Sequence, residues 1–362
     1  MLKQEQQVKK ISFEGEQIFV GIDTHKKTWK VSLYHQQTSL KTFTHEPNSK
    51  QLVRYLRRHY PGADFHCAYE AGFSGFWLQK QLTKEGIDCI VVNPADIPTS
   101  HKDKEFKTDP RDCRKIAIAL RSNLLEGIYI PTDAGLEYRK IVRLYHDMSR
   151  NYTRYKNKVK AIINFHGIEY PEEFRSENNH WSKRFYLWLK QLTLSTEYGN
   201  WSLQWYVEEC LRAKEQKRIA LAKVRELSKT ECLLNNVTCL RSISGIGLVT
   251  AMTIITEIED IKRFKNLDTL CAYIGLVPST SSSGEKERIG EITRRGNKYL
   301  RHVIVESAWM AIRRDPVLLN AYLRVKNKSE SNKAIIRVSR KLAARIMYVL
   351  VNQKPYEVKY MQ

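Results

Sequence analysis

The stretch KTDPRDCRKIAIAL, residues 107–120, decides how the first part of this chain is interpreted. Asp109 and Asp112 stand three residues apart at the predicted start of a helix, so both carboxylates can point into one small volume. Oxygen ligands of this kind suit Mg²⁺ or Mn²⁺. The same residues also make an ordinary helix start, with Asp109 as N-cap, Pro110 in the first turn and Asp112 favoured by the helix dipole. On this stretch alone, capping is the simpler interpretation.

The residues before this helix show the periodicity of an α/β domain. We expect a strand that ends at Asp23, further strands over residues 30–34, 39–44, 64–70 and 87–94, and helices over residues 47–60 and 72–84. Three antiparallel strands followed by α/β crossovers is the order of a ribonuclease-H-like fold.

Asp23 would close the first of these strands and Glu70 the fourth, and ligand sites form at the strand ends of α/β sheets. Taken singly, Asp23 could be a turn residue and Glu70 a surface charge. Four acids at converging ends favour a metal site over capping.

Composition points to a polyanionic partner. The 362 residues include 61 Lys and Arg against 39 Asp and Glu, which gives a net charge of +22 spread along the chain. Nucleic acid is the first candidate. There is no apolar run of spanning length and no signal-peptide pattern, so no membrane partner is expected. The seven cysteines form no C-x-x-C pair, which indicates reduced thiols of an intracellular protein rather than a zinc site.

The rest of the chain is predicted to be mainly helical. Long amphipathic helices over residues 132–167 and 205–228 suggest a coiled coil. Arginines and tyrosines interleaved over residues 139–158 could track a phosphate backbone, although most are expected to form the solvated face of a packing stripe. We expect a leader over 1–16, an α/β domain over 17–131, a helical coiled-coil region over 132–235 and a C-terminal domain over 236–362.

Two segments of the C-terminal part could carry function. LRSISGIGLVTAMTIITEI, residues 240–258, fits a helix–hairpin–helix motif in which Gly245 and Gly247 expose backbone N–H groups to a phosphate, and it fits a tight helix connection equally well. Residues 279–284 are predicted to form a serine-rich loop ahead of a basic segment. That loop could be a flexible surface segment, or it could present a nucleophilic hydroxyl among arginines.

Six motifs occur in an order that identifies a family. They are FVGIDTHKKTW, AYEAGFSGFWL, VVNP with KTDPRDCRKIA, SISGIGLVTA, AYIGLVPSTSSSGEK and IGEITRRGNKYLR. Through them the chain resembles the DEDD-type insertion-sequence transposases related to the Piv invertase, the IS-one-ten family of bridge recombinases. The resemblance covers nearly the whole chain. It implies a RuvC-like (ribonuclease H-like) N-terminal domain, a helical coiled-coil middle and a mainly helical C-terminal transposase domain, an α/β plus α architecture.

The resemblance also implies residue roles. In this family the four acids form a metal site, here Asp23, Glu70, Asp109 and Asp112, and a serine before a glycine is the nucleophile. That serine is Ser283, with Ser282 as the alternative because three serines occur in a row.

The basic residues after the serine loop have expected roles as well. Arg294 and Arg295 are candidates to stabilise charge on the phosphate, and Arg301 is a further candidate nucleic-acid contact. The implied partners are donor and target DNA, a structured guide RNA, and further copies of the chain in a homodimer or homotetramer, in the cytoplasm of a bacterium.

Three functions follow from these residues. The first is an RNA-guided DNA recombinase of a mobile element that works through a serine–phosphate intermediate. The second is a RuvC-like structure-specific nuclease in which water attacks and Ser283 is incidental. The third is a non-catalytic nucleic-acid-binding protein in which the acids are helix caps.

Overall fold

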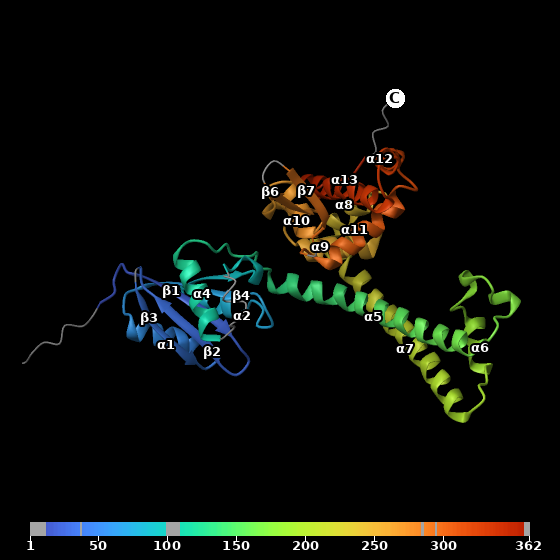
Figure 1. The fold of residues 1–362 in the computed structure, drawn as a ribbon, viewed down its shortest axis with the longest axis horizontal. Coiled ribbons are helices and arrows are strands. Elements are labelled where there is room, and N and C mark those ends of the chain that lie inside the picture. The colour runs from blue at the N-terminus through green and yellow to red at the C-terminus, as the bar shows by residue number, and fades with distance from the viewer. Residues whose placement is uncertain (1–11, 37, 99–108, 284–285, 294, 358–362) are drawn as a thin grey trace, which may run out of the picture. The chain divides into compact units, whose positions relative to one another are not determined.

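The computed structural model describes residues 12–36, 38–98, 109–283, 286–293 and 295–357 (Figure 1). For residues 109–110, 279–283, 286–289 and 291, nothing is described beyond the backbone. The chain divides into two compact units, Met1–Ile130 and Pro131–Gln362. The finer division into a leader, a coiled-coil region and a C-terminal domain stays a prediction.

The first unit contains a mixed five-stranded sheet. Its strands are β1 (Gln17–Thr24), β2 (Trp29–Tyr34), β3 (Ser39–His45), β4 (Asp64–Glu70) and β5 (Asp88–Val92). They lie in the order β3-β2-β1-β4-β5. β2 is antiparallel to β1 and β3, whereas β4 is parallel to β1 and β5. An antiparallel meander continued by parallel strands is consistent with the predicted ribonuclease-H-like order.

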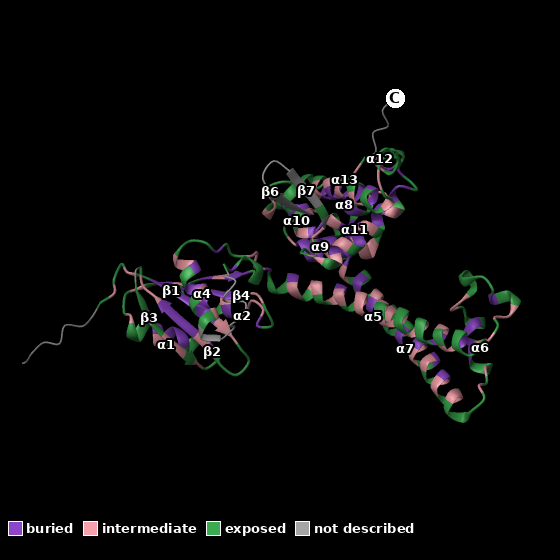
Figure 2. Ribbon diagram, in the orientation of Figure 1, coloured by how far each residue is buried: buried purple, intermediate pink, exposed green. Residues whose placement is uncertain are grey.

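Helices cover both faces of this sheet. α1 (Ser49–His59) and α2 (Trp77–Lys84) pack on one face, where Ile18, Val20 and Ile22 of β1 join a core with leucines of both helices. α4 (Asp109–Arg121) packs on the other face, where Ala68 of β4 joins a smaller core with residues of α4. Between β5 and α4 lies the short helix η1 (Pro94–Asp96). Because both faces are covered, β1 is largely buried (Figure 2).

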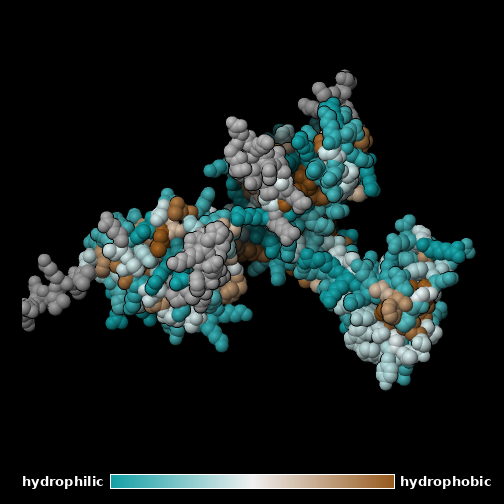
Figure 3. Space-filling view, in the orientation of Figure 1, coloured by the Kyte–Doolittle hydropathy of each residue, from teal (hydrophilic) through white to brown (hydrophobic). Residues whose placement is uncertain are grey.

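Two long helices begin the second unit and pack along each other (Figure 1). They are α5 (Asp133–Phe165) and α7 (Glu197–Leu227), joined through η2 (Glu172–Phe174), η3 (Glu177–Asn179) and α6 (Lys183–Gln191). α7 begins eight residues before the predicted start, because the Thr196 hydroxyl accepts a hydrogen bond from Gly199 N and caps the helix. Figure 3 shows hydrophobic side chains gathered at the end of the pair that carries α6.

The remaining elements share one core. They are α8 (Glu231–Arg241), α9 (Leu248–Ile258), η4 (Ile261–Arg263), α10 (Leu267–Ile274), β6 (Pro278–Ser283), β7 (Lys286–Ile292), α11 (Lys298–Ala311), α12 (Pro316–Lys326) and α13 (Ser331–Asn352). Within this core, Arg345 of α13 donates a hydrogen bond to Asp315, which also caps α12. Burial is the largest single influence and acts to raise the pKa of Asp315, but the hydrogen bonds from Arg345 and Leu318 and the charge of Arg345 together outweigh it, so the pKa lies below its ordinary value.

The prediction of a serine-rich loop is wrong, because residues 278–283 form the strand β6. β6 pairs antiparallel with β7, with Thr280 opposite Ile289 and Ser283 opposite Lys286. A run of serines has no apolar alternation to indicate a strand, yet its backbone N–H and C=O groups are satisfied by a partner strand close by in the sequence. Gly284, which follows Ser283, lies outside the described residues.

Buried thiols occur in both units. Six of the seven cysteines are buried, Cys232 is exposed, and all are free thiols. In the part of the chain that the structure describes, no helix is both long enough and apolar enough to cross a membrane.

Candidate functional site

Gly21 brings the backbone of α4 directly onto β1. A Cβ built on Gly21 would stand 2.1 Å from the carbonyl oxygen of Cys113 and 2.5 Å from the backbone nitrogen of Ala117. A residue with any side chain would push the helix away. This contact fixes the first turns of α4 against the central strand.

Strand alternation carries Asp23 and Glu70 to the face that α4 covers. Residues two apart on a strand share a face, so Asp23 lies on the face of Gly21, and Glu70 lies on the face of Ala68. Ile22 of β1 stands opposite Tyr69 of β4 in the parallel register. Asp23 and Glu70 each follow this pair by one residue, so they are neighbours at the C-terminal ends of two adjacent parallel strands.

Asp112 lies in the first turn of α4, directly before Cys113. The pKa of the Cys113 thiol is raised to about 11, mainly by burial and then by the negative charge of Asp23. Asp23 is thus close enough to the start of α4 to act on it electrostatically. Asp109 begins the same helix, and its side chain is not described. Asp23 and Glu70 therefore lie at one edge of the sheet, and Asp112 belongs to the helix turn that packs near Asp23.

Basic side chains lie against two of these acids. His25 Nε2 is 3.2 Å from Asp23 Oδ2, and Lys115 Nζ is 3.4 Å from Asp112 Oδ1. The Asp23 and Asp112 side chains are 19% and 25% exposed, so both carboxylates are partly shielded from water. The sequence argument missed Lys115, although its position three residues after Asp112 places it on the same helix face.

The predicted ligands have the right chemistry for a divalent ion. All four are carboxylates, which suit Mg²⁺ or Mn²⁺, and two of them, Asp23 and Glu70, are neighbours at one edge of the sheet. Among the side chains that the structure describes, no three His, Cys, Asp or Glu residues lie close enough together to hold a metal ion. The donor type therefore suits the ion, but the described side chains are not arranged to hold it, so a metal site at these acids stays a prediction.

Ser282 and Ser283 lie at the end of β6 in the second unit. In the hairpin, Ser282 stands opposite Glu287 and Ser283 opposite Lys286. Their side chains are not described, and Arg294 lies outside the described residues. Both serines therefore stand beside the connection between β6 and β7, and their role as nucleophile stays a prediction.

Arg301, predicted as a nucleic-acid contact, makes hydrogen bonds within the protein. Its Nη2 atom donates hydrogen bonds to the carbonyl oxygens of Thr293, at 2.9 Å, and Arg295, at 2.6 Å. These bonds hold the segment that leads into α11. Arg295 itself is exposed, and nucleic-acid contacts of both arginines stay predictions.

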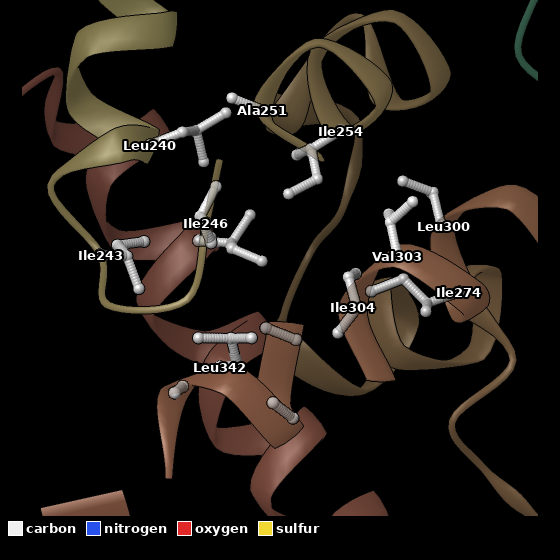
Figure 4. Packing of buried hydrophobic residues seen from close by; sticks show 14 of the residues in the cluster. Leu240, Ile243, Ile246, Ala251, Ile254, Ile274, Leu300, Val303, Ile304 and Leu342 are labelled. Carbon is white, nitrogen blue, oxygen red and sulfur yellow. The ribbon is translucent and has the colours of Figure 1, made fainter. Parts of the chain in front are cut away.

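The two glycines of the predicted helix–hairpin–helix differ. Gly245 has φ +89°, and a Cβ there would stand 2.4 Å from the Ser307 carbonyl oxygen, so both conformation and packing require glycine. Figure 4 shows Ile243 and Ile246, on either side of it, within the hydrophobic core. Gly247 is exposed at the N-cap of α9 and has open space around its Cα. Tight packing accounts for Gly245, and phosphate binding at Gly247 stays a prediction.

An ion pair between the partly exposed Arg143 and the buried Glu257 joins α5 to α9. Arg143 Nε and Nη2 donate to the two carboxylate oxygens of Glu257, at 2.6 Å and 2.7 Å, and Asn297 Nδ2 donates to Oε2 at 2.7 Å. Only 1% of the Glu257 side chain is exposed. The hydrogen bond to Glu257 raises the pKa of Arg143. Arg143 therefore belongs to the packing, although it lies within the predicted phosphate-tracking row. A glutamate inside the apolar run TIITEI is the signal that could have indicated it.

Comparisons with known proteins match both units. A family model described as "Transposase", of the DEDD type, matches residues 20–167, and one described as "Transposase IS116/IS110/IS902 family" matches residues 237–323. The y4qE protein of Sinorhizobium fredii is 33% identical over 67% of this chain and 58% of its own length. The transposase for insertion sequence element IS1533 of Leptospira borgpetersenii is 25% identical over 69% of this chain and 72% of its own length. The transposase for insertion sequence element IS1111A of Coxiella burnetii is 25% identical over 75% and 73%.

The DEDD-type model spans Asp23, Glu70, Asp109 and Asp112. The chain therefore belongs to the IS110/IS116/IS902 family of transposases.

Proposed function

We propose that this chain cleaves and rejoins DNA strands of an insertion element, with help from a divalent metal and through a covalent serine–phosphate link. One observation carries the proposal. Asp23 and Glu70 stand at the ends of two adjacent parallel strands, and the start of α4, which carries Asp112, lies against the first of these strands. Helix capping would explain only the acids of α4. It would not explain why acids also stand at the ends of β1 and β4.

The four carboxylates would hold Mg²⁺ or Mn²⁺, with Asp109 as the fourth ligand at the start of α4. The ion would supply Lewis-acid stabilisation and orient the scissile phosphate. Lys115, on the same helix face as Asp112, is placed to neutralise a phosphate oxygen brought to this edge.

The proposed nucleophile is Ser283, with Ser282 as the alternative. Its Oγ would attack phosphorus, the bond from phosphorus to the 3′-oxygen would break, and the leaving oxygen would take a proton to become a 3′-hydroxyl. One phosphoester bond replaces another, so rejoining by a new 3′-hydroxyl needs no further energy source. Arg294 and Arg295 are the candidates to stabilise charge on the phosphate oxygens.

The serine is tested by comparing Ser283→Ala with Ser282→Ala on plasmid DNA carrying the element's ends. Ser283→Ala should abolish both cleavage and the covalent protein–DNA adduct seen on a denaturing gel, and Ser282→Ala should retain both. Full cleavage by Ser283→Ala would favour the nuclease that uses water.

The acids are tested with Asp109→Asn and Asp112→Asn combined. Asparagine caps a helix nearly as well as aspartate, so circular dichroism and melting temperature should stay unchanged. Metal-dependent cleavage should be lost, because the amides cannot replace charged ligands. Unchanged activity would favour helix capping and a non-catalytic binding protein.

We further propose that a structured RNA guides the reaction and that the chain acts as a homodimer or homotetramer. The family resemblance supports both, and the net charge of +22 suits a protein that holds several nucleic-acid strands. RNA that copurifies with the chain should be dominated by one structured species on sequencing, and a heterogeneous mixture would count against guidance.

A further inference from the structure

A groove of about 710 Å³ lies along α5, beside α11, in the second unit. Along α5 it is lined by Arg150, Arg154 and Lys158 and by Ser149, Thr153 and Asn157. His302 of α11 lines the opposite side. None of these residues belongs to the site described above, and we refer to this feature as the α5 groove.

The first row along the groove is cationic. Arg150, Arg154 and Lys158 are spaced by four residues, so their side chains share one helix face and rise by about 6 Å at each step. Arg154 and Lys158 are exposed, and neither pairs with a carboxylate in the described part of the chain. A regular row of exposed cations at this step suits successive phosphates of one nucleic-acid strand.

The second row is polar and uncharged. Ser149, Thr153 and Asn157 each directly precede one of the cations, so they form a parallel row with the same step. The Thr153 hydroxyl donates to the Ser149 carbonyl oxygen at 3.1 Å and keeps its lone pairs as acceptors. Asn157 offers both an amide donor and a carbonyl acceptor.

Contacts of Tyr299 connect the two helices that line the groove. The Tyr299 ring lies between two guanidinium groups, with Arg143 at 4.8 Å and Arg150 at 5.5 Å from the ring centre. Arg150 also donates to the Tyr299 hydroxyl at 3.3 Å, and Arg143 is fixed by its pair with the buried Glu257. α5 and the start of α11 are thereby joined, so both walls of the groove are set before a ligand arrives.

We propose that the α5 groove binds the backbone of a single RNA strand. The cations contact phosphates, and the uncharged row contacts ribose 2′-hydroxyls, which both donate and accept hydrogen bonds. A DNA strand would satisfy the cations and leave the second row unpaired. The inference rests on the proposed function only in that the chain handles nucleic acid.

The cationic row is tested through the salt dependence of binding. The full-length chain is titrated with a short fluorescent oligouridylate at several potassium chloride concentrations. Combining Arg154→Gln with Lys158→Gln should reduce the slope of log affinity against log salt by about 1.4, because each phosphate contact on a single strand contributes about 0.7. The matched control combines Lys183→Gln with Arg184→Gln, two exposed residues of α6. Equal slopes for the two double variants would overturn the proposal.

The polar row is tested by comparing oligouridylate with oligodeoxyuridylate of the same length. The unaltered chain should prefer RNA by about fivefold, the worth of one net hydrogen bond. Asn157→Ala should remove most of that preference while leaving the salt slope unchanged. Equal affinity of the unaltered chain for both oligonucleotides would overturn the assignment to RNA.

These outcomes are independent of the catalytic proposal. Asp23→Asn should abolish cleavage and leave both the salt slope and the RNA preference intact. If the groove proposal is wrong, the predicted changes in salt slope and RNA preference will be missing while DNA cleavage is unaffected. The two proposals can therefore fail separately.

Discussion

Gly21→Ala should displace α4 from the sheet. The new Cβ would stand 2.1 Å from the Cys113 carbonyl oxygen and 2.5 Å from the Ala117 nitrogen, whereas real Cβ contacts essentially never fall below 3.0 Å. Both of the contacted atoms belong to the main chain, so no side-chain rotation can relieve the overlap. The helix itself has to move by roughly 1 Å.

Two effects of different size follow from that shift. Overpacking of one methyl group costs about 1–3 kcal/mol, and we expect the upper end because backbone has to move. Asp112 would also shift relative to Asp23, and a misplacement of about 1 Å costs about 100-fold in rate. Activity should therefore fall much more than stability.

Urea unfolding followed by circular dichroism measures the first effect, and the initial rate of metal-dependent DNA cleavage measures the second. Gly72→Ala is the matched control, because its Cβ would meet only the Glu70 carbonyl oxygen, at 4.0 Å. The control should stay within about 0.5 kcal/mol of the unaltered chain. If Gly21→Ala matches this control in both assays, the close contact does not position the acids.

Three further changes test the second unit. Arg143→Met should lower the free energy of unfolding by about 3 kcal/mol, because Glu257 is left buried without its main partner; urea unfolding that shows no loss would contradict this. Gly245→Ala should cost at least about 2 kcal/mol from backbone strain and overlap with α11, whereas Gly247→Ala, with open space, should melt close to the unaltered chain. Asp315 has a folded pKa below its unfolded value of about 3.9, so its carboxylate stabilises the fold above about pH 4 and this contribution is lost as pH falls through the folded pKa. The stability gap between the unaltered chain and Asp315→Asn, from urea unfolding at several pH values, should therefore be widest near neutral pH and narrow in acid.

The sequence could predict those features that depend on local pattern. The sequence predicts strands that end near Asp23 and Glu70, and the structure has strands at both places. These strands could be predicted because the apolar pattern that indicates a strand lies within the strand's own few residues. The convergence of the Asp23 and Glu70 side chains with Asp112 stays a prediction, and the structure shows only that the missing side chain of Gly21 lets α4 lie directly on β1.

Features that depend on distant partners could not be predicted. Residues 278–283 form a strand because of their pairing with β7, and serine carries no apolar alternation to reveal it. Arg143 and Glu257 are 114 residues apart, so nothing local to either indicates that they pair. The same holds for the α5 groove, since His302 reaches it from α11.

The Arg143–Glu257 pair limits how this chain can be divided into working parts. A fragment that begins at residue 236 would retain Glu257 and Asn297 but lose Arg143 with the rest of α5. Its buried carboxylate would then have to take up a proton or draw water into the core, and either costs stability. A division at Ile130 and Pro131 keeps the pair whole. An exchange of C-terminal parts between related transposases should therefore transfer α5 together with α9.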